Sequence, residues 1–118
     1  MNSPKIIIVE DDITLGESFA DIFRLNDHTV DVIVDGAHAV ERILREHPRL
    51  LVLDMHLPHV DGLEILTQLR ALPELADLKV AVVSADATMV SKSAPLADAT
   101  LLKPIGIRQL LGLLELLT

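Results

Sequence analysis

The chain has no cysteine, no tryptophan and no tyrosine among its 118 residues. Without cysteine it can form neither disulfide bonds nor metal sites built on thiolates. Phe19 and Phe23 are its only aromatic residues. So few aromatic side chains disfavour both base stacking and an aromatic-lined cofactor pocket.

Positive charge and long apolar runs are also scarce. Ten Lys and Arg stand against 18 Asp and Glu, and the net charge of −8 disfavours direct binding to nucleic acid or anionic lipid. The first apolar run is followed by three acids, which is unlike a signal peptide. The leucine-rich stretch 110–117 is too short to span a bilayer and contains Glu115. We therefore expect a cytoplasmic protein that does not contact membranes.

Half of the residues are hydrophobic, and the length suits one domain, which we expect over residues 1–118. Short β-type runs alternate with segments of helical periodicity along the chain. The expected strands are 5–9, 30–34, 50–53, 80–83 and 99–102. The expected helices are 13–25, 37–46, 62–71 and 106–117, with a weaker one at 86–95 that has Pro95 near its end.

Alternating strands and helices predict right-handed crossovers and a parallel sheet covered on both faces. We expect an α/β fold with five strands in the doubly wound order 2-1-3-4-5, which is flavodoxin-like. Asp31 within the second run indicates an edge strand. Asp61, followed three residues later by Glu64, has the spacing of a capping box and predicts a helix start.

Polar residues follow the apolar runs where strands of the expected sheet end. Residues 10–12 are all acidic, and Asp54 follows the third run. Ser84 and Lys103 follow the fourth and fifth runs. Ligands of open parallel sheets bind at the carboxyl ends of the strands, near the point where the strand order reverses. The sequence therefore predicts a site at this edge of the sheet.

The residue types at this edge suit phosphoryl chemistry. Crowded carboxylates repel one another, and a divalent cation relieves that repulsion; with oxygen ligands only, Mg²⁺ is the natural ion. One carboxylate can then attack phosphorus and form an acyl phosphate. Mg²⁺ and Lys103 would supply positive charge to the phosphoryl oxygens, and Ser84 a hydrogen bond. The pattern predicts phosphoryl transfer to Asp54.

Four sequence blocks carry a resemblance to a known family: IIIVEDD at 6–12, LLVLDMHLPHVDG at 50–62, AVVSA at 81–85 and LLKP at 101–104. Asp54, Pro58 and Asp61-Gly62 keep a specific spacing, and a hydroxyl residue stands 30 positions after Asp54. On these blocks the chain resembles the receiver domain of the two-component response regulator family over essentially its whole length.

The resemblance implies a role for each acidic residue of the site. Asp54 corresponds to the phospho-accepting aspartate. Asp11 corresponds to a direct Mg²⁺ ligand, Glu10 to an acid that acts through water, and the backbone carbonyl of His56 to the third protein ligand. Asp12 is expected to cap the following helix instead.

The resemblance also assigns Ser84 as the switch hydroxyl and Lys103 as the family's lysine, with a cis peptide bond before Pro104. The donor would be a histidine kinase or a histidine phosphotransfer protein. The chain would catalyse only its own phosphorylation and dephosphorylation, so it is not expected to be an enzyme in any other sense.

Two departures from the family pattern concern the output. Thr100 stands where an aromatic residue usually reports phosphorylation to the surface. Ser84 and Lys103 are 19 residues apart, about three fewer than the resemblance implies, and the missing residues fall within 86–95. We expect phosphorylation to pull Ser84 inward, with a readout through the order of this loop and helix or through dimerisation.

The segment 106–117 has more apolar residues than one helical stripe requires. Its second face would contact another copy of the chain, or an output domain absent from this sequence.

Three alternatives remain. A receiver that no longer switches would act as a docking module. A Mg²⁺-dependent phosphatase of the haloacid-dehalogenase type would need an aspartate where His56 stands. A Toprim-type nuclease would need an acid pair after the third strand.

His56 and Asp86 are each two residues beyond a predicted site residue, so we expect them to border the site and tune the access of water.

Overall fold

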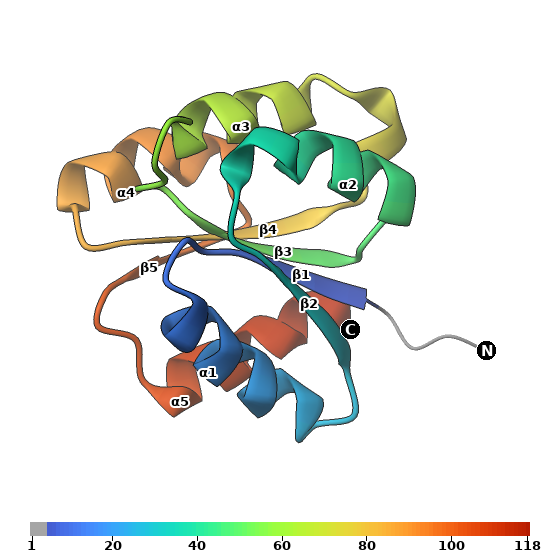
Figure 1. Cartoon of the computed structure of the whole chain (residues 1–118), viewed down its shortest axis with the longest axis vertical. Coiled ribbons are helices and arrows are strands. Elements are labelled where there is room, and N and C mark those ends of the chain that lie inside the picture. The colour runs from blue at the N-terminus through green and yellow to red at the C-terminus, as the bar shows by residue number, and fades with distance from the viewer. Residues whose placement is uncertain (1–4) are drawn as a thin grey trace.

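The computed structural model describes residues 5–118 as a five-stranded sheet between two layers of helices (Figure 1). Its strands are β1 (Lys5–Val9), β2 (Thr29–Ile33), β3 (Leu50–Asp54), β4 (Lys79–Ser84) and β5 (Ala99–Leu102). They lie in the order β2-β1-β3-β4-β5, and all neighbouring strands are parallel. The predicted fold class, strand order and edge position of β2 are therefore confirmed.

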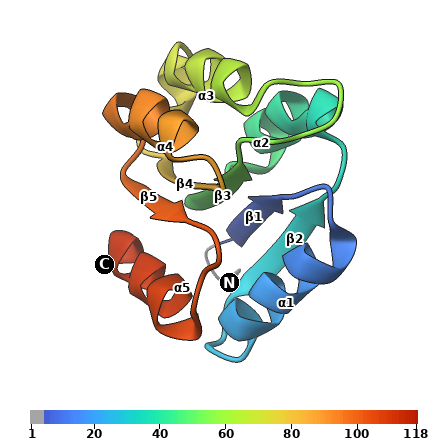
Figure 2. The same ribbon diagram turned by 90° about the vertical axis from the view of Figure 1, so that its left-hand side faces the viewer.

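A helix follows each strand. The helices are α1 (Ile13–Arg24), α2 (Ala39–Glu46), α3 (Gly62–Arg70), α4 (Ala87–Ser93) and α5 (Ile107–Leu113). Short 3₁₀ helices lie at Gly36–His38, Pro73–Leu75, Ala94–Leu96 and Leu114–Leu117. Helices α2, α3 and α4 cover one face of the sheet, and α1 and α5 cover the other (Figures 1 and 2).

The three central strands separate two hydrophobic cores. Alternate residues of β1 face opposite sides, so Ile7 lies in the core under α2 and α3, while Ile6 lies in the core under α1 and α5. Each of the residues in 50–53 is fully buried, whichever side it faces. Because both faces are covered, these strands are continuous apolar runs without an alternating pattern, and each buried Leu or Ile contributes about 1.5–3 kcal/mol.

Several predicted boundaries were wrong by one to a few residues. The second strand spans 29–33 and not 30–34, and β3 and β4 include Asp54 and Ser84 as their last residues. The second helix begins with a 3₁₀ turn, which Asp35 caps by accepting the backbone N–H of Ala37 at 2.9 Å. The last helix is α-helical only to Leu113, beyond which the chain tightens into a 3₁₀ turn.

Aspartates begin three of the helices that start at the carboxyl edge of the sheet. Their side chains each accept a backbone N–H from the first turn, at 2.8–3.2 Å, which satisfies a donor without an intrahelical partner. The pairs are Asp12 with Leu15, Asp61 with Leu63, and Asp86 with Thr88. The predicted caps at Asp12 and Asp61 are confirmed. Among the hydrogen bonds of residues 5–118, none returns from the Glu64 side chain, so the predicted capping box is only half formed.

Helix α5 buries Leu110 and Leu113 against the sheet, while Ile107 on another side of the helix is 61% exposed. The predicted contact of this second face with another copy or an output domain stays a prediction.

Away from the carboxyl ends of the strands, two positively charged and two negatively charged side chains link β1, β2 and α2. Lys5 contacts Asp31 at 2.8 Å and also pairs with Glu46, and Arg42 contacts the same two carboxylates. The hydrogen bond from Lys5, with further help from Arg42, lowers the pKa of Glu46 from 4.5 to about 2. A pKa that is depressed on folding contributes stability above its unfolded value, and this stability is lost as pH falls toward the folded value.

We therefore predict that Glu46→Gln flattens the loss of stability between about pH 4.5 and pH 2, where the native carboxylate stays ionised and the unfolded one takes up a proton. The free energy of unfolding, measured by urea denaturation across this range, checks the prediction. Glu41→Gln is the matched control, because Glu41 is an exposed residue of the same helix. Equal slopes for the two variants would contradict the assignment to Glu46.

Candidate functional site

Asp54 ends the fully buried strand β3 and is itself only 3% exposed. Its Oδ1 accepts the backbone N–H of His56 at 3.2 Å. This bond orients the carboxylate at the carboxyl end of β3 and places the backbone of His56 against it. The predicted role of the His56 carbonyl as a metal ligand stays a prediction.

Two further acids come from the loop after β1. Glu10 is 2% exposed, and its Oε2 accepts the backbone N–H of Asp12 at 3.2 Å. Asp11 is exposed to solvent. Glu10, Asp11 and Asp54 each offer one oxygen, and these oxygens lie within 4.8 Å of one another. The adjacent parallel strands β1 and β3 thus bring the predicted acids together.

Lys103 enters the acidic cluster from the end of β5. Its Nζ lies 2.8 Å from Glu10 Oε1 and 3.6 Å from Asp54 Oδ2. Burial alone would lower the pKa of Lys103, but the hydrogen bond to Glu10 and the charge of Asp54 outweigh it and raise this pKa above its ordinary value. The lysine therefore stays protonated and places a positive charge next to the Asp54 carboxylate. The Lys103-Pro104 peptide bond is cis, as predicted.

Burial raises the pKa of Glu10 to about 7, and the neighbouring charge of Asp54 adds to this effect. The hydrogen bonds from Lys103 and from the Asp12 backbone act in the opposite direction without cancelling the rise. The cause is the cost of removing a carboxylate from water. One ammonium group therefore does not fully compensate the carboxylates in this cluster.

The residues present fit a hard divalent cation. All the side-chain donors of the cluster are carboxylate oxygens, which suit Mg²⁺. Such an ion would neutralise the negative charge that Lys103 leaves uncompensated. Because Asp11 is exposed, one side of the cluster is open to solvent for the water molecules that Mg²⁺ keeps.

Ser84, the last residue of β4, is fully buried. Its Oγ accepts the backbone N–H of Asp86 at 3.0 Å. The Asp86 side chain in turn caps α4 by accepting the N–H of Thr88 at 2.8 Å. The hydroxyl at the end of β4 is thus hydrogen bonded to the residue that begins α4.

His56 and Asp86 approach each other from the loops after β3 and β4. Their Nε2 and Oδ2 atoms are 4.0 Å apart, and both side chains are about half exposed. The structure therefore places the two residues predicted to border the site on facing loops beside it.

Arg70 is a residue that sequence reasoning missed. From the end of α3 it donates to the carbonyl oxygens of Leu96 and Leu78 and to Asp98 Oδ2, at 2.8 Å in each case. Asp98 Oδ2 also accepts the N–H of Val80 at 2.8 Å. Together these bonds form the Arg70 clamp, which fixes the start of β5 to α3 and β4. An arginine at a helix end and an aspartate 28 residues later give no sequence signal for it.

Thr100 lies in the edge strand β5, where it is partly buried and pairs with Val82. Helix α4 has only seven residues and passes directly into the 3₁₀ turn 94–96 that contains Pro95. The predicted weak helix is therefore confirmed as a short one.

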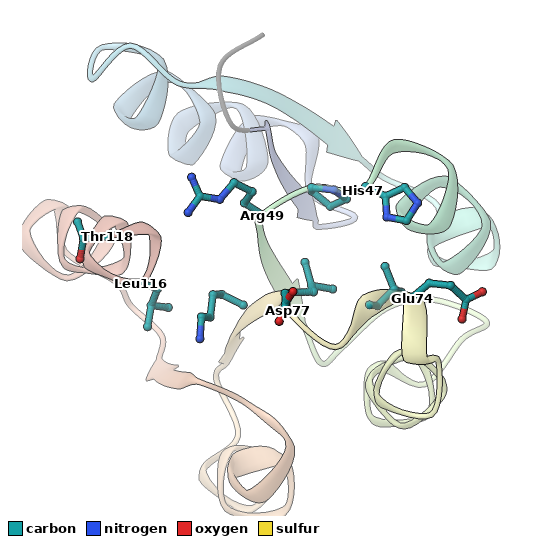
Figure 3. Close-up of a pocket in the computed structure, with 10 residues that line it drawn as sticks. His47, Arg49, Glu74, Asp77, Leu116 and Thr118 are labelled. Carbon is teal, nitrogen blue, oxygen red and sulfur yellow. The ribbon is translucent and has the colours of Figure 1, made fainter. Parts of the chain in front are cut away.

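A pocket separate from the acidic cluster lies at the other end of the sheet, where β3 and β4 begin (Figure 3). Its volume is about 550 Å³, and charged side chains of both signs line it, including Arg49, Lys79, Glu74 and Asp77. Arg49 also donates to the carbonyl oxygen of Leu117 at 3.0 Å. Among its lining residues none belongs to the predicted site.

The fold and the cluster together define the class of this protein. It is a doubly wound α/β protein with an acidic site and a partly buried lysine at the carboxyl edge of the sheet, next to strands β1 and β3 where the strand order reverses.

The chain belongs to the response regulator receiver domain family, whose sequence model matches residues 6–115. It is 36% identical over 113 residues to the response regulator MprA of Mycobacterium ulcerans (strain Agy99), covering 93% of this chain and 48% of that protein. The MprA of Mycobacterium leprae (strain TN) is 35% identical over 111 residues, covering 92% and 48%. The chain thus spans about half the length of the curated relatives it matches.

Solved structures agree with this assignment. A CheY-like response regulator receiver domain protein from Methanospirillum hungatei JF-1 superposes with a TM-score of 0.87 at 26% identity, covering 97% of this chain and 92% of that one. The CheY-like receiver domain from Methylobacillus flagellatus gives 0.86 at 28% identity, covering 97% and 98%. Within residues 5–118, no helix is long and apolar enough to cross a membrane.

Gly62, the first residue of α3, lets the loop after β3 fold tightly behind Asp54. A Cβ at this position would lie 2.6 Å from Met55 Cα and 2.8 Å from the Asp54 carbonyl oxygen, both backbone atoms. Backbone cannot move aside as a flexible side chain can, so this close approach requires glycine.

We predict that Gly62→Ala destabilises the protein by about 1–3 kcal/mol through overpacking. In Gly112→Ala, nothing lies within 4 Å of the added Cβ, and we predict a gain of about 0.5–1 kcal/mol from better helix propensity. Urea denaturation of both variants checks the two signs. A Gly62→Ala protein as stable as the wild type would contradict the close packing behind Asp54.

Proposed function

We propose that this receiver domain accepts a phosphoryl group on Asp54 from the phosphohistidine of a histidine kinase or histidine phosphotransfer protein. The observation that carries the proposal is the position of the Lys103 ammonium, between the carboxylates of Glu10 and Asp54 in one acidic cluster. Phosphoryl transfer needs a nucleophile and fixed positive charge side by side, and this arrangement supplies both.

In the proposed step, a carboxylate oxygen of Asp54 forms a bond to phosphorus while the phosphorus–nitrogen bond of the donor breaks. The electron pair of that bond remains on the donor nitrogen, and the imidazole leaves as the neutral ring, with a proton from water if its other nitrogen carries none. Asp54 needs no base to activate it, because an ionised carboxylate is already a nucleophile.

The remaining groups act on the phosphoryl oxygens. Lys103, 3.6 Å from Asp54 Oδ2, is close enough to move its ammonium from the carboxylates to a phosphoryl oxygen. Glu10, Asp11, Asp54 and the His56 carbonyl would hold Mg²⁺, which when bound neutralises charge on the transferring group. Ser84 would turn its hydroxyl toward the same group.

The switch that we propose begins at Ser84. If its hydroxyl turns to the phosphoryl group, it exchanges the N–H of Asp86 for a new partner. Asp86 is the cap of α4, so the first turn of this short helix loses its anchor. The far end of the segment stays fixed, because the Arg70 clamp holds Leu96 and Asp98. The readout would therefore be a loosened start of α4, without an aromatic residue on β5.

We predict that phosphoramidate with Mg²⁺ adds one phosphoryl group to the wild-type protein, detected by intact mass, and that chelating the metal prevents this. Asp54→Asn abolishes the adduct because the nucleophile is lost. Asp61→Asn is the matched control: Asp61 lies in the loop after β3, and asparagine caps a helix as well as aspartate does. An adduct that persists in Asp54→Asn would contradict the proposal.

For the switch, we predict that beryllofluoride and Mg²⁺ speed hydrogen exchange at the amides of Thr88 and Val90, which bond to Asp86. The amide of Ile65, bonded to Asp61 in α3, should not change. In Arg70→Gln the faster exchange should extend to residues 94–99, since the clamp is gone.

A receiver that is phosphorylated but serves only as a docking module is the second candidate. The Arg70 clamp favours it, because the clamp holds the segment just before β5 in place. Phosphorylation without any change in exchange at 86–90 would support this candidate and contradict the proposed switch.

A further inference from the structure

An apolar groove of about 420 Å³ opens beside the acidic cluster. Helix α1, which contributes to its lining, covers the same face of the sheet as α5 (Figure 2). Its lining residues come from α1 and from the loops after β4 and β5, and Lys103 is the one charged residue among them. They are Leu15, Phe19, Ala85, Lys103, Pro104 and Ile105.

The groove and the site share one residue, Lys103. Lys103 lines it and also places its Nζ 3.6 Å from Asp54 Oδ2. Ala85 lines it and directly follows Ser84, the hydroxyl at the end of β4. A molecule with an anionic head at Lys103 would therefore extend its other end over apolar side chains.

The apolar surface of the groove is left uncovered by the fold. Leu15 and Ile105 pack against the core under α1 and α5, yet both are only partly buried. An apolar lining that includes one charged residue suits a small amphipathic molecule.

We propose that this groove binds the alkyl tail of a small-molecule phosphodonor, an alkanoyl phosphate longer than acetyl phosphate. The inference rests on the proposed phosphorylation of Asp54. The phosphoryl head meets Lys103 and the carboxylate nucleophile, and the tail lies against Leu15, Ala85 and Ile105.

The reaction balances without any further reactant. An Asp54 oxygen bonds to phosphorus, and the bond between phosphorus and the acyl oxygen breaks. The electron pair leaves with the alkanoate anion, and no proton is transferred. In such displacements the leaving group lies opposite the attacking oxygen, and in the proposed binding mode this departing acyl group is the part of the donor that contacts the groove.

The tail should speed the reaction by a factor that grows with its length. Complete burial of a methylene group strengthens binding about fourfold, and an open groove that covers half of it about twofold. Hexanoyl phosphate has four more methylene groups than acetyl phosphate, so we expect a ratio of roughly 16 between their second-order rate constants. The leaving carboxylates have nearly the same basicity, which keeps the chemical step comparable.

The experiment measures Asp54 phosphorylation by acetyl, butanoyl and hexanoyl phosphate at subsaturating concentration with Mg²⁺, and by phosphoramidate, which has no tail. The quantity compared is the ratio of the hexanoyl to the acetyl rate within each protein. Leu15→Ser and Ile105→Ser should each bring this ratio close to one.

Leu25→Ser is the matched control, because Leu25 is 84% exposed at the far end of α1, away from the groove, and it should keep the wild-type ratio. Ala85→Leu is a second variant, which fills the groove without removing any core side chain and should also lower the ratio. A binding readout is independent of the reaction: hexylphosphonate, unlike methylphosphonate, should shift the methyl NMR signals of Leu15 and Ile105.

The outcomes separate the two proposals. Phosphorylation by phosphoramidate and by all three alkanoyl phosphates at equal rates would overturn the groove inference and leave the function of Asp54 intact. No phosphorylation by any donor would overturn the proposed function, and the groove inference with it. A ratio that grows with chain length and falls in the groove variants supports both.

Discussion

The positive charge of Lys103, held between two buried carboxylates, is the interaction on which the site depends. Glu10 and Asp54 are almost completely buried, at 2% and 3% exposure. Burying a carboxylate without a partner costs several kcal/mol, and removing one member of a buried pair typically costs about 3–5 kcal/mol. Lys103 offsets only part of this cost, since the pKa of Glu10 is still raised to about 7. The site is therefore electrostatically incomplete, which suits a cation and a phosphoryl group as additional partners.

The sheet makes this interaction between distant parts of the chain. Glu10 and Lys103 are 93 positions apart in sequence, yet the order β2-β1-β3-β4-β5 brings the ends of β1, β3 and β5 to the same edge. The buried runs of β1 and β3 fix the register in which Val9 lies opposite Leu53, the residue before Asp54. Core packing thus sets the distance between the acids, and the tight turn at Gly62 keeps the following loop close behind Asp54.

The sheet and the acidic cluster could be predicted because they follow from the periodicity of apolar residues and from the residue types at the ends of the apolar runs. Continuous apolar runs flanked by helical periodicity predict a buried parallel sheet, and acids or a lysine directly after such runs must meet at its carboxyl edge. The cluster of Glu10, Asp11, Asp54 and Lys103 could be foreseen on this basis. Strand and helix ends were less certain, because local hydrogen bonds such as the cap at Asp35 decide them.

The Arg70 clamp and the apolar groove could not be predicted from the sequence. Each combines residues from three or more elements whose side chains are unremarkable alone: Arg70 with Leu78, Leu96 and Asp98, and Leu15 with Ala85 and Ile105. Both depend on how helices pack over the sheet, which the pattern of apolar residues specifies only coarsely. The sequence shows that the segment 84–103 is short, but it does not reveal that Arg70 of α3 bonds to Leu96 and Asp98 within it.

On phosphorylation, Lys103 is proposed to exchange its carboxylate partners for the phosphoryl group on Asp54. A crystal structure of the protein with Mg²⁺ and beryllofluoride tests this most directly. We predict that Nζ of Lys103 leaves Glu10 Oε1, now 2.8 Å away, and contacts a fluorine atom of an adduct on Asp54. An adduct on Asp54 with Lys103 still bonded to Glu10 would contradict it.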